Sequence, residues 1–310
     1  MEIYTLFLMI EMQSEVQQIH IENENNIQLF IKREDLIHPF ISGNKYRKLK
    51  YNLLEAKKLE HDVVLTFGGA FSNHITATAF ASKEMGFKTI GVIRGDELVS
   101  KIDENPTLSF AKENGMQFHF VSRDDYRKKS SEIFLNELKK RFDNFYLIPE
   151  GGTNQLAVKG CEEILTSEDS NYDYICTCVG TGGTISGLIN SSFEGQKILG
   201  FPALKGDFLN KEISNFATKK NWKLITDYHF GGYAKINTEL VTFINDFKSK
   251  YSIPLDPIYT GKMLFGLFDM ISKGRFKPNT KILLIHTGGL QGISGMNERL
   301  KSKSMPLIKV

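Results

Sequence analysis

The chain has 310 residues, of which 41% are apolar and 24% charged, and its 39 basic and 36 acidic side chains leave a net charge of +3. This composition excludes disordered, collagen-like and membrane-spanning classes, and so balanced a charge gives no sign of a nucleic-acid or membrane surface. The length suits two domains or one large one.

Glycine is ordinary in number, at 26, but ten of these residues lie in five adjacent pairs, at 68–69, 151–152, 182–183, 231–232 and 288–289. Paired glycines allow backbone to approach a ligand closely or to turn with positive φ. The pairs are therefore where a binding site is expected.

The predicted elements alternate between helices and short apolar strands. In chain order we expect a helix at 46–60, strands at 63–67, 88–95 and 116–122, helices at 105–114, 124–141 and 154–167, and strands at 174–179 and 281–286. Apolar strands alternating with helices indicate an α/β fold with mostly parallel sheets flanked by helices. Three strands run into glycine pairs, and ligands in such sheets bind at the carboxyl ends of strands.

The chain ends and cysteines indicate a cytoplasmic protein. The apolar stretch Ile3–Ile10 has no basic residues before it and no small-residue cleavage site, so it does not read as a secretory signal. Cys161, Cys176 and Cys178 fit neither a disulfide framework nor a zinc site. We expect buried thiols, and the scattered histidines predict no metal site.

The loop at 180–187, Gly-Thr-Gly-Gly-Thr-Ile-Ser-Gly, is the first candidate for chemistry. N–H groups at the start of a helix, with the hydroxyls of Thr181 and Thr184, form an anion cradle. The third glycine of a dinucleotide fingerprint would fall at Ile185, and no Walker lysine follows. A single-phosphate cradle remains, with a simple packing turn as the alternative.

Two further segments carry reactive side chains. Lys45 follows Ser-Gly-Asn, and crowding by Arg47 and Lys48 would lower its pKa toward that of a nucleophile; a solvated basic face is the alternative. Ser72-Asn73-His74 at a helix start offers donors to a substrate carboxylate, or Ser72 is only a helix cap. No G-x-S-x-G elbow supports a serine hydrolase.

Together these pieces resemble the pyridoxal-phosphate enzymes of the tryptophan-synthase-β fold type. Within that family they look like the branch holding 1-aminocyclopropane-1-carboxylate deaminase and D-cysteine desulfhydrase. The matching motifs, in family order, are KREDL, SGNKYRKLKY, GGAFSNH, PEGGTN, VGTGGTISGL, GGYAK, LDPIYTGKM and IHTGG. They span about residues 32–289, while residues 94–150 and the tail after Gly292 match poorly.

The resemblance implies a larger cofactor-binding domain of residues 1–50 and 156–310, a smaller inserted α/β domain of residues 51–155, and a homodimer. Lys45 looks like the Schiff-base lysine, Tyr233 and Tyr259 like the tyrosines that flank the substrate, and Ser72, Asn73 and His74 like the carboxylate clamp. Ser72 is counted with the catalytic group as well. The resemblance gives the following residues to pyridoxal 5′-phosphate: Lys45, Lys48, Asn73 at the 3-hydroxyl, Val179, Gly180, Thr181, Gly182, Gly183 and Thr184 at the phosphate, and Thr287 at the pyridine nitrogen.

The residue after the second tyrosine favours one of the two activities that the resemblance implies. The cyclopropane deaminases have an acidic residue there, facing the pyridine nitrogen, whereas this chain has Thr260. A neutral hydroxyl leaves a weaker electron sink, so we expect D-cysteine desulfhydrase-like β-elimination on a small amino acid, with cyclopropane deamination as the alternative. A nicotinamide dehydrogenase is disfavoured by the broken fingerprint. A non-catalytic ligand-binding relative stays open, since it would keep the phosphate loop without needing Lys45.

Overall fold

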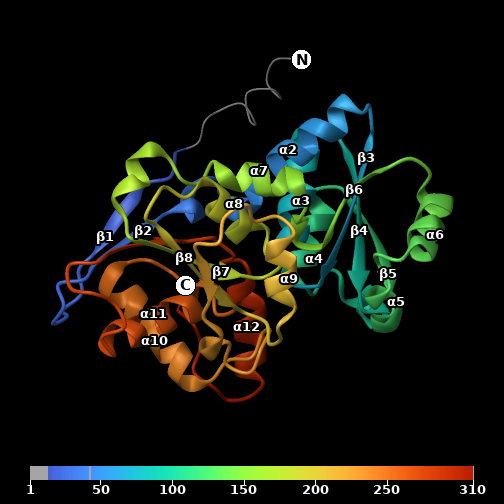
Figure 1. The fold of residues 1–310 in the computed structure, drawn as a ribbon. Helices are drawn as coiled ribbons and strands as arrows, with labels where there is room; N and C mark the ends of the chain where they lie inside the picture. Colours follow the sequence, from blue (N-terminus) through green and yellow to red (C-terminus); the bar gives the residue numbers. More distant parts are fainter. Residues whose placement is uncertain (1–12, 42, 310) are drawn as a thin grey trace.

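The computed structural model describes residues 13–41 and 43–309, so Ile3–Ile10 and Ser42 lie outside the described residues. These residues form two sheets flanked by helices, side by side in Figure 1. The six-stranded sheet has the order β1-β2-β10-β7-β8-β9 and the four-stranded sheet the order β5-β4-β3-β6. The α/β fold with mostly parallel sheets is confirmed.

The six-stranded sheet joins strands from both ends of the chain. Its strands are β1 (Val16–Ile19), β2 (Gln28–Lys32), β7 (Tyr174–Val179), β8 (Lys197–Pro202), β9 (Trp222–Leu224) and β10 (Lys281–Ile285). All neighbours are parallel except β1 and β2. In the centre, Leu283 pairs with Phe30 of β2 and with Ile175 of β7.

The four-stranded sheet comes from one continuous stretch of chain and is wholly parallel. Its strands are β3 (Val63–Gly69), β4 (Lys88–Arg94), β5 (Met116–Val121) and β6 (Tyr146–Ile148). β3 lies between β4 and β6, so the loop that follows it emerges from the middle of this sheet.

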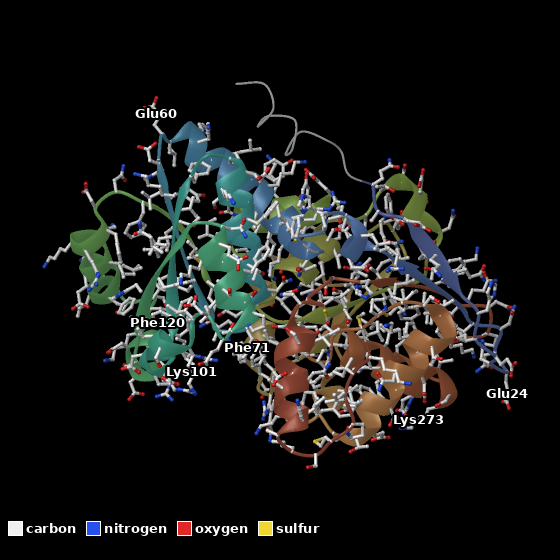
Figure 2. The ribbon with its side chains drawn as sticks, turned by 180° about the vertical axis from the view of Figure 1, so that it is seen from behind. Glu24, Glu60, Phe71, Lys101, Phe120 and Lys273 are labelled. Carbon is white, nitrogen blue, oxygen red and sulfur yellow. The ribbon has the colours of Figure 1, made fainter. Side chains whose placement is uncertain are left out.

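The helices cover both sheets, as the opposite views in Figure 1 and Figure 2 show. The α-helices are α2 (Asn44–Lys58), α3 (Asn73–Glu84), α4 (Pro106–Glu113), α5 (Arg123–Arg127), α6 (Glu132–Phe142), α7 (Gln155–Glu162), α8 (Gly183–Ser191), α9 (Phe208–Ser214), α10 (Thr238–Tyr251), α11 (Thr260–Ser272) and α12 (Gly292–Lys301). The 3-10 helices are η1 (Glu34–Leu36), η2 (Asp96–Lys101), η3 (Glu150–Gly152), η4 (Ser167–Asn171) and η5 (Thr226–Tyr228).

Two predicted helices are shorter than expected because side-chain caps begin new elements inside them. The prediction of one helix at 124–141 is wrong: the Ser131 hydroxyl accepts from Phe134 N–H and starts α6 after a break from α5. The helix predicted at 154–167 ends at Glu162, and Thr166 opens η4 with a capping box.

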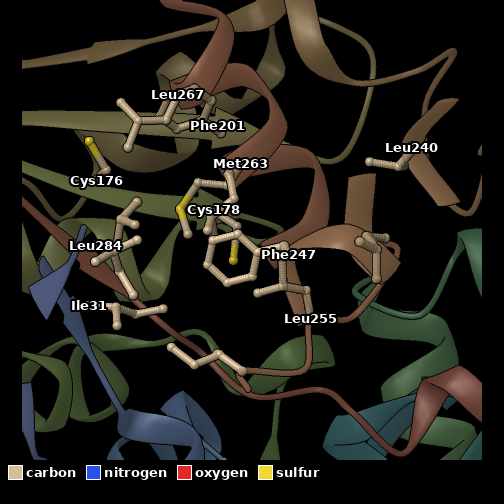
Figure 3. Close-up of a cluster of buried hydrophobic side chains, with 14 of the residues drawn as sticks. Ile31, Cys176, Cys178, Phe201, Leu240, Phe247, Leu255, Met263, Leu267 and Leu284 are labelled. Carbon is tan, nitrogen blue, oxygen red and sulfur yellow. The ribbon is translucent and has the colours of Figure 1, made fainter. Parts of the chain in front are cut away.

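The centre of the six-stranded sheet is fixed by apolar side chains on both faces. Cys176 and Cys178 of β7 point into a cluster with Met263 and Leu267 of α11 (Figure 3). Because successive strand residues alternate between faces, Ile175 and Val179 enter the opposite cluster, beneath α8. β7 is thus packed on both faces up to the point where its glycine loop begins.

Close helix contacts hold α2 beside α7 and α8. A Cβ on Gly160 of α7 would lie 1.9 Å from the carbonyl oxygen of Arg47, and one on Gly187 of α8 would lie 2.5 Å from the Cβ of Cys161. Real Cβ atoms do not approach so closely, so glycine is required at both positions. This packing sets the distance between the first turns of α2 and α8, where the site lies.

The KREDL segment forms buried ion pairs at the end of β2. Lys32 pairs with Asp169, Arg33 with Asp35, and Glu34 with Arg47 of α2. Each of these charged groups is buried with its partner, as buried charges require. The motif therefore fixes α2 to the six-stranded sheet.

Candidate active site

The helix that carries Lys45 starts against the loop after β10. Gly43 has φ +61°, and a Cβ there would lie 1.9 Å from the carbonyl oxygen of Thr287. The N–H of Asn44 donates to that same oxygen at 3.3 Å. Only glycine allows this approach, and it places the first turn of α2 at the centre of the site.

The Lys45 amine lies in a desolvated position, where burial lowers its pKa and the nearby thiols of Cys161 and Cys178 offset part of that shift. Its Nζ is 3.5 Å from Oδ1 of Asn44. The expectation that Arg47 crowds this amine is wrong, because the Arg47 guanidinium is paired with Glu34 at 3.0 Å. Desolvation favours the neutral, nucleophilic form of the amine.

Lys48 and two threonine hydroxyls meet at the glycine loop. The Lys48 Nζ donates to Gly151 O at 3.1 Å, to Thr153 Oγ1 at 3.0 Å and to Thr181 Oγ1 at 3.4 Å. The two hydroxyl oxygens are 2.6 Å apart. Thr153 was missed from the sequence, although it lies in the PEGGTN motif that the resemblance includes.

The start of α8 completes this cradle. Gly182 caps the helix in a left-handed conformation, φ +89°, with no side-chain cap. A Cβ on Gly183 would lie 2.8 Å from Thr153 Oγ1 and 3.2 Å from Lys48 Cε. The positive end of a helix dipole, an ammonium and two hydroxyls therefore converge on a space that suits a group with several anionic oxygens.

The charge of Lys48 supports such a group. Burial, and then the neighbouring Lys45, lower the pKa of Lys48 to about 7. Its hydrogen-bond partners are a carbonyl and two hydroxyls, all uncharged. A buried ammonium with neutral partners lacks a counter-ion, and the phosphate of a cofactor would supply one.

The remaining predicted loop residues lie alongside the cradle. Val179 ends β7, Gly180 packs against the ring of Tyr259, and Thr184 Oγ1 accepts from Asn44 Nδ2 at 2.7 Å. The structure thus brings the whole segment 179–184 together with α2.

The Ser72-Asn73-His74 segment begins α3 at the carboxyl end of β3. Ser72 occupies the cap position but makes no side-chain cap bond, and Asn73 opens the helix. His74 is buried and its Nε2 lies 2.8 Å from Thr66 Oγ1. Because that hydroxyl donates its proton to Ile148 O at 2.9 Å, His74 Nε2 is the donor to Thr66.

His74 therefore differs from its expected role. Burial and the charges of Lys45 and Lys48 keep its pKa well below 6.5, so the ring is neutral. Its Nε2–H is used within the four-stranded sheet and cannot serve a substrate carboxylate. Ser72 and Asn73 are left as the predicted carboxylate donors of this loop.

The two tyrosines meet across the loop after η5 and the start of α11. The Tyr233 and Tyr259 ring centroids are 6.3 Å apart with the planes at 65°. A Cβ on Gly180 would lie 3.2 Å from Cε1 of Tyr259, so this ring rests on the glycine loop. Burial raises the pKa of Tyr259 well above 10, and the neighbouring Tyr233 and Asp256 add to the shift. The Tyr259 phenol is therefore a neutral proton donor.

Asp256 holds Tyr259 in place and was missed from the sequence. Its carboxylate accepts from the N–H groups of Ile258 at 2.9 Å, Tyr259 at 2.8 Å and Thr260 at 2.8 Å, and from the Thr260 hydroxyl at 2.7 Å. These bonds satisfy backbone N–H groups at the start of α11, whose cap position is Tyr259, and the Asp-Pro-Ile-Tyr-Thr pattern could have indicated them. The Thr260 hydroxyl is consequently bound to Asp256.

Thr287 lies beside a thiol that sequence reasoning left without a role. Its Oγ1 is 3.0 Å from Cys178 Sγ, and burial raises the pKa of Cys178 to about 12, so the thiol is neutral. The described cysteines, Cys161, Cys176 and Cys178, are all free and buried. Thr287 presents no charged group to the site.

A further cluster faces the site from the poorly matched segment. The Tyr126 hydroxyl donates to Glu150 at 2.8 Å, and Lys129 pairs with the same carboxylate at 3.1 Å. The guanidinium of Arg94 lies 5.8 Å from the Tyr126 ring centroid, and its charge opposes the rise in the pKa of Tyr233 that burial causes. Glu150 is the first residue of the 3-10 helix η3, and its carboxylate is the acceptor of this cluster.

Across 13–41 and 43–309, no group of three or more His, Cys, Asp or Glu side chains could hold a metal ion. Over the same ranges, no helix is both long and apolar enough to cross a membrane.

Comparison with known proteins adds three findings. A family described as "Pyridoxal-phosphate dependent enzyme" matches residues 15–288. The bifunctional D-cysteine desulfhydrase/1-aminocyclopropane-1-carboxylate deaminase of Arabidopsis thaliana mitochondria is 33% identical over 90% of this chain and 76% of its own. A crystal structure of a homologue of 1-aminocyclopropane-1-carboxylate deaminase has a TM-score of 0.79 and 29% identity, covering 97% of this chain and 99% of that one.

A second solved structure shares the fold at low identity. The hydrogen sulfide-producing enzyme of Fusobacterium nucleatum has a TM-score of 0.65 and 16% identity, covering 92% of this chain and 98% of that one.

Proposed function

Because the chain belongs to the family of pyridoxal-phosphate-dependent enzymes, we propose that its site eliminates a leaving group from a small amino acid, with D-cysteine as the favoured substrate. D-Cysteine and water would give pyruvate, hydrogen sulfide and ammonia. The second candidate is 1-aminocyclopropane-1-carboxylate, which with water would give 2-oxobutanoate and ammonia. One observation carries the proposal: the desolvated Lys45 amine lies one helical turn from a buried, anion-deficient cradle centred on Lys48.

The described residues fit pyridoxal phosphate. Its phosphate would be held by Lys48, Thr153, Thr181 and the start of α8, where a buried ammonium lacks a counter-ion. When bound, the cofactor supplies an electron sink that stabilises negative charge at the substrate Cα. Asn73 at the 3-hydroxyl and Thr287 at the ring nitrogen remain proposals for the rest of the cofactor.

The chain's own groups would perform the proton transfers. Lys45 Nζ, whose pKa burial lowers, would be the base for the Cα proton. The Tyr259 phenol, whose pKa is raised well above 10, would give its proton to the departing sulfur. Ser72 and Asn73 would orient the substrate carboxylate, and Tyr233 would close the site beside Tyr259.

The neutral side chains around the site support β-elimination over ring opening. Thr287 and Cys178 are uncharged, and the Thr260 hydroxyl is taken up by Asp256, whose oxygens already accept four hydrogen bonds. Opening a cyclopropane ring without loss of a Cα proton needs the stronger sink that a carboxylate at the ring nitrogen provides. The Arabidopsis relative carries both activities in its name, so both substrates belong in the test.

The test compares products from the purified enzyme. We expect sulfide and pyruvate from D-cysteine to form faster than 2-oxobutanoate from 1-aminocyclopropane-1-carboxylate, and the reverse order would overturn the substrate assignment. The Lys45→Ala variant should keep the fold and some cofactor affinity but lose turnover. The Lys58→Ala variant, which changes the exposed face of the same helix, should retain turnover. A wild-type protein that binds the cofactor without turnover of either substrate would favour a non-catalytic relative.

We also propose a larger domain of residues 1–50 and 156–310 and a smaller one of residues 51–155. Support comes from the four-stranded sheet, which uses only residues between Val63 and Ile148. Limited proteolysis should then cut first in the mostly exposed residues 59–62 that follow α2, because residue 50 itself lies inside that helix. Early cuts inside either sheet would contradict these boundaries.

A cytoplasmic homodimer is the last part of the proposal. The three buried free thiols of the chain suit a reducing compartment such as the cytoplasm. Phe40 is 48% exposed, and its ring centroid lies 4.7 Å from that of Phe80 in a tilted pair and 5.8 Å from that of Phe110 in a stacked pair. Together they form an apolar surface suited to a second copy. Light scattering of the purified protein should give twice the chain mass, and Phe40→Asp should shift it toward the monomer.

A further inference from the structure

A hollow of about 890 Å³ lies at the amino ends of β7, β8 and β9. Tyr174, Lys197 and Trp222, the first residues of these strands, all line it. The cofactor loop follows the opposite, carboxyl end of β7, and six strand residues span roughly 20 Å. The hollow is therefore separate from the active site.

The walls of this hollow are aromatic and apolar. Trp222 and Phe193 line it, with Tyr174 and Phe276, whose rings meet edge to face at 5.1 Å. Met270 adds apolar surface, whereas Ile198 and Leu199, which also line the hollow, are buried. Aromatic faces favour a planar ring that can stack on them.

The rim of the hollow is basic. Its charged lining residues are Lys197, Lys219, Lys220, Lys223, Arg275 and one acid, Glu194. Five cations against one acid leave a local charge of +4, more than the +3 of the whole chain. No salt bridge among residues 13–41 and 43–309 engages Lys197, Lys220 or Lys223.

We propose that this hollow binds a nucleoside phosphate, with the base against the aromatic wall and the phosphates at the lysine rim. Its volume falls within the ~300–1,000 Å³ of small-molecule sites. The ligand needs both a ring and an anionic group. Aromatic walls alone do not select a charged ligand, and a basic rim alone does not select a nucleobase. The near-neutral rest of the chain favours a single nucleotide over a nucleic-acid strand, which would follow a longer basic surface.

The chain provides its own reporter for this site. Trp222 is its only tryptophan, so intrinsic fluorescence, excited at the red edge where adenine does not absorb, reads the hollow directly. The holoenzyme is titrated with ATP, with adenosine and with inorganic triphosphate. We expect ATP to quench the fluorescence saturably, with a dissociation constant at least tenfold lower than that of adenosine or of triphosphate alone.

Charge-reversal variants locate the binding. The double variant Lys220→Glu, Lys223→Glu should raise the dissociation constant of ATP at least tenfold. It should leave turnover and the cofactor spectrum unchanged, because both side chains are exposed and far from Lys45. Lys301→Glu with Lys303→Glu makes the same charge change at the exposed end of α12 and should leave ATP affinity unchanged.

Four results would overturn the proposal. The first is that ATP causes no saturable quenching, and the second is that inorganic triphosphate binds as tightly as ATP. The third is that both double variants weaken ATP binding equally. The fourth is that acrylamide does not quench Trp222 because a second copy of the chain covers the hollow. Since turnover is measured separately, none of these results bears on the proposed elimination activity.

Discussion

Replacing Lys48 by methionine should make the apo-protein more stable at low pH while weakening cofactor binding. The pKa of Lys48 is about 7 in the folded chain and about 10.5 when exposed, and at 1.36 kcal/mol per pH unit the difference corresponds to about 5 kcal/mol. Below pH 7 both states carry the proton, so the folded apo-protein bears this whole penalty. Between about pH 7 and 10.5 only the unfolded chain keeps the proton, so wild-type stability rises with pH.

The assay is urea unfolding of both apo-proteins at several pH values. Lys48→Met should exceed the wild type by several kcal/mol near pH 6, and this gap should shrink as pH rises toward 10. Lys58→Met, on the exposed part of the same helix, should show no such trend. A gap between wild type and Lys48→Met that does not change with pH would refute the argument.

The same substitution should weaken cofactor binding. A charge-assisted hydrogen bond contributes about 1.5–3 kcal/mol, so losing the ammonium should raise the cofactor dissociation constant about 10- to 100-fold. An absorbance titration with pyridoxal phosphate measures this. An unchanged dissociation constant would place the phosphate elsewhere.

Three other changes test neighbouring parts of the site. Gly183→Ala should weaken cofactor binding at least tenfold, because the new Cβ would lie 2.8 Å from Thr153 Oγ1. Equilibrium dialysis measures this affinity, and Gly292→Ala, whose Cβ would meet nothing within 4 Å, is the control. Asp256→Ala should lower the free energy of unfolding by about 3 kcal/mol or more, since each buried donor left unpaired costs about 1–3 kcal/mol, and Asp256→Asn should lose less; equal losses would contradict its capping role. Arg94→Met should raise KM for the amino acid several-fold and leave the cofactor spectrum unchanged. An unchanged KM would show that Arg94 does not act on the bound substrate.

The glycine loops predict the candidate site because they have a physical signature in the sequence. An apolar strand that runs into paired glycines and then into a helix must place a ligand-accessible turn at a sheet edge, and Gly182-Gly183 does so beside Lys48. The order of motifs along the chain added the family. Neither signal depends on contacts between distant residues.

What the sequence could not supply were partners brought together only by tertiary packing. Thr153 meets Lys48 across 105 residues, and Thr287 meets Cys178 across 109. Arg47 looked like a neighbour of Lys45 because it is near in sequence, but its side chain leaves the opposite side of α2 to pair with Glu34. Short-range patterns do not encode such pairings, and Arg94, Tyr126 and Lys129 lie in a segment that matches the family poorly.

The position of β10 between β2 and β7 decides when this enzyme can acquire its cofactor. The four-stranded sheet is complete once residue 148 has been made, but β2, at residues 28–32, pairs with β10, at residues 281–285. Pairings between such distant residues make folding slow. The first turn of α2 also rests on the carbonyl of Thr287, so the Lys45 amine reaches its final position only after nearly the whole chain has been synthesised. During translation the β1–β2 pair must therefore wait for β10, and the part of the site around Lys45 is completed late in folding.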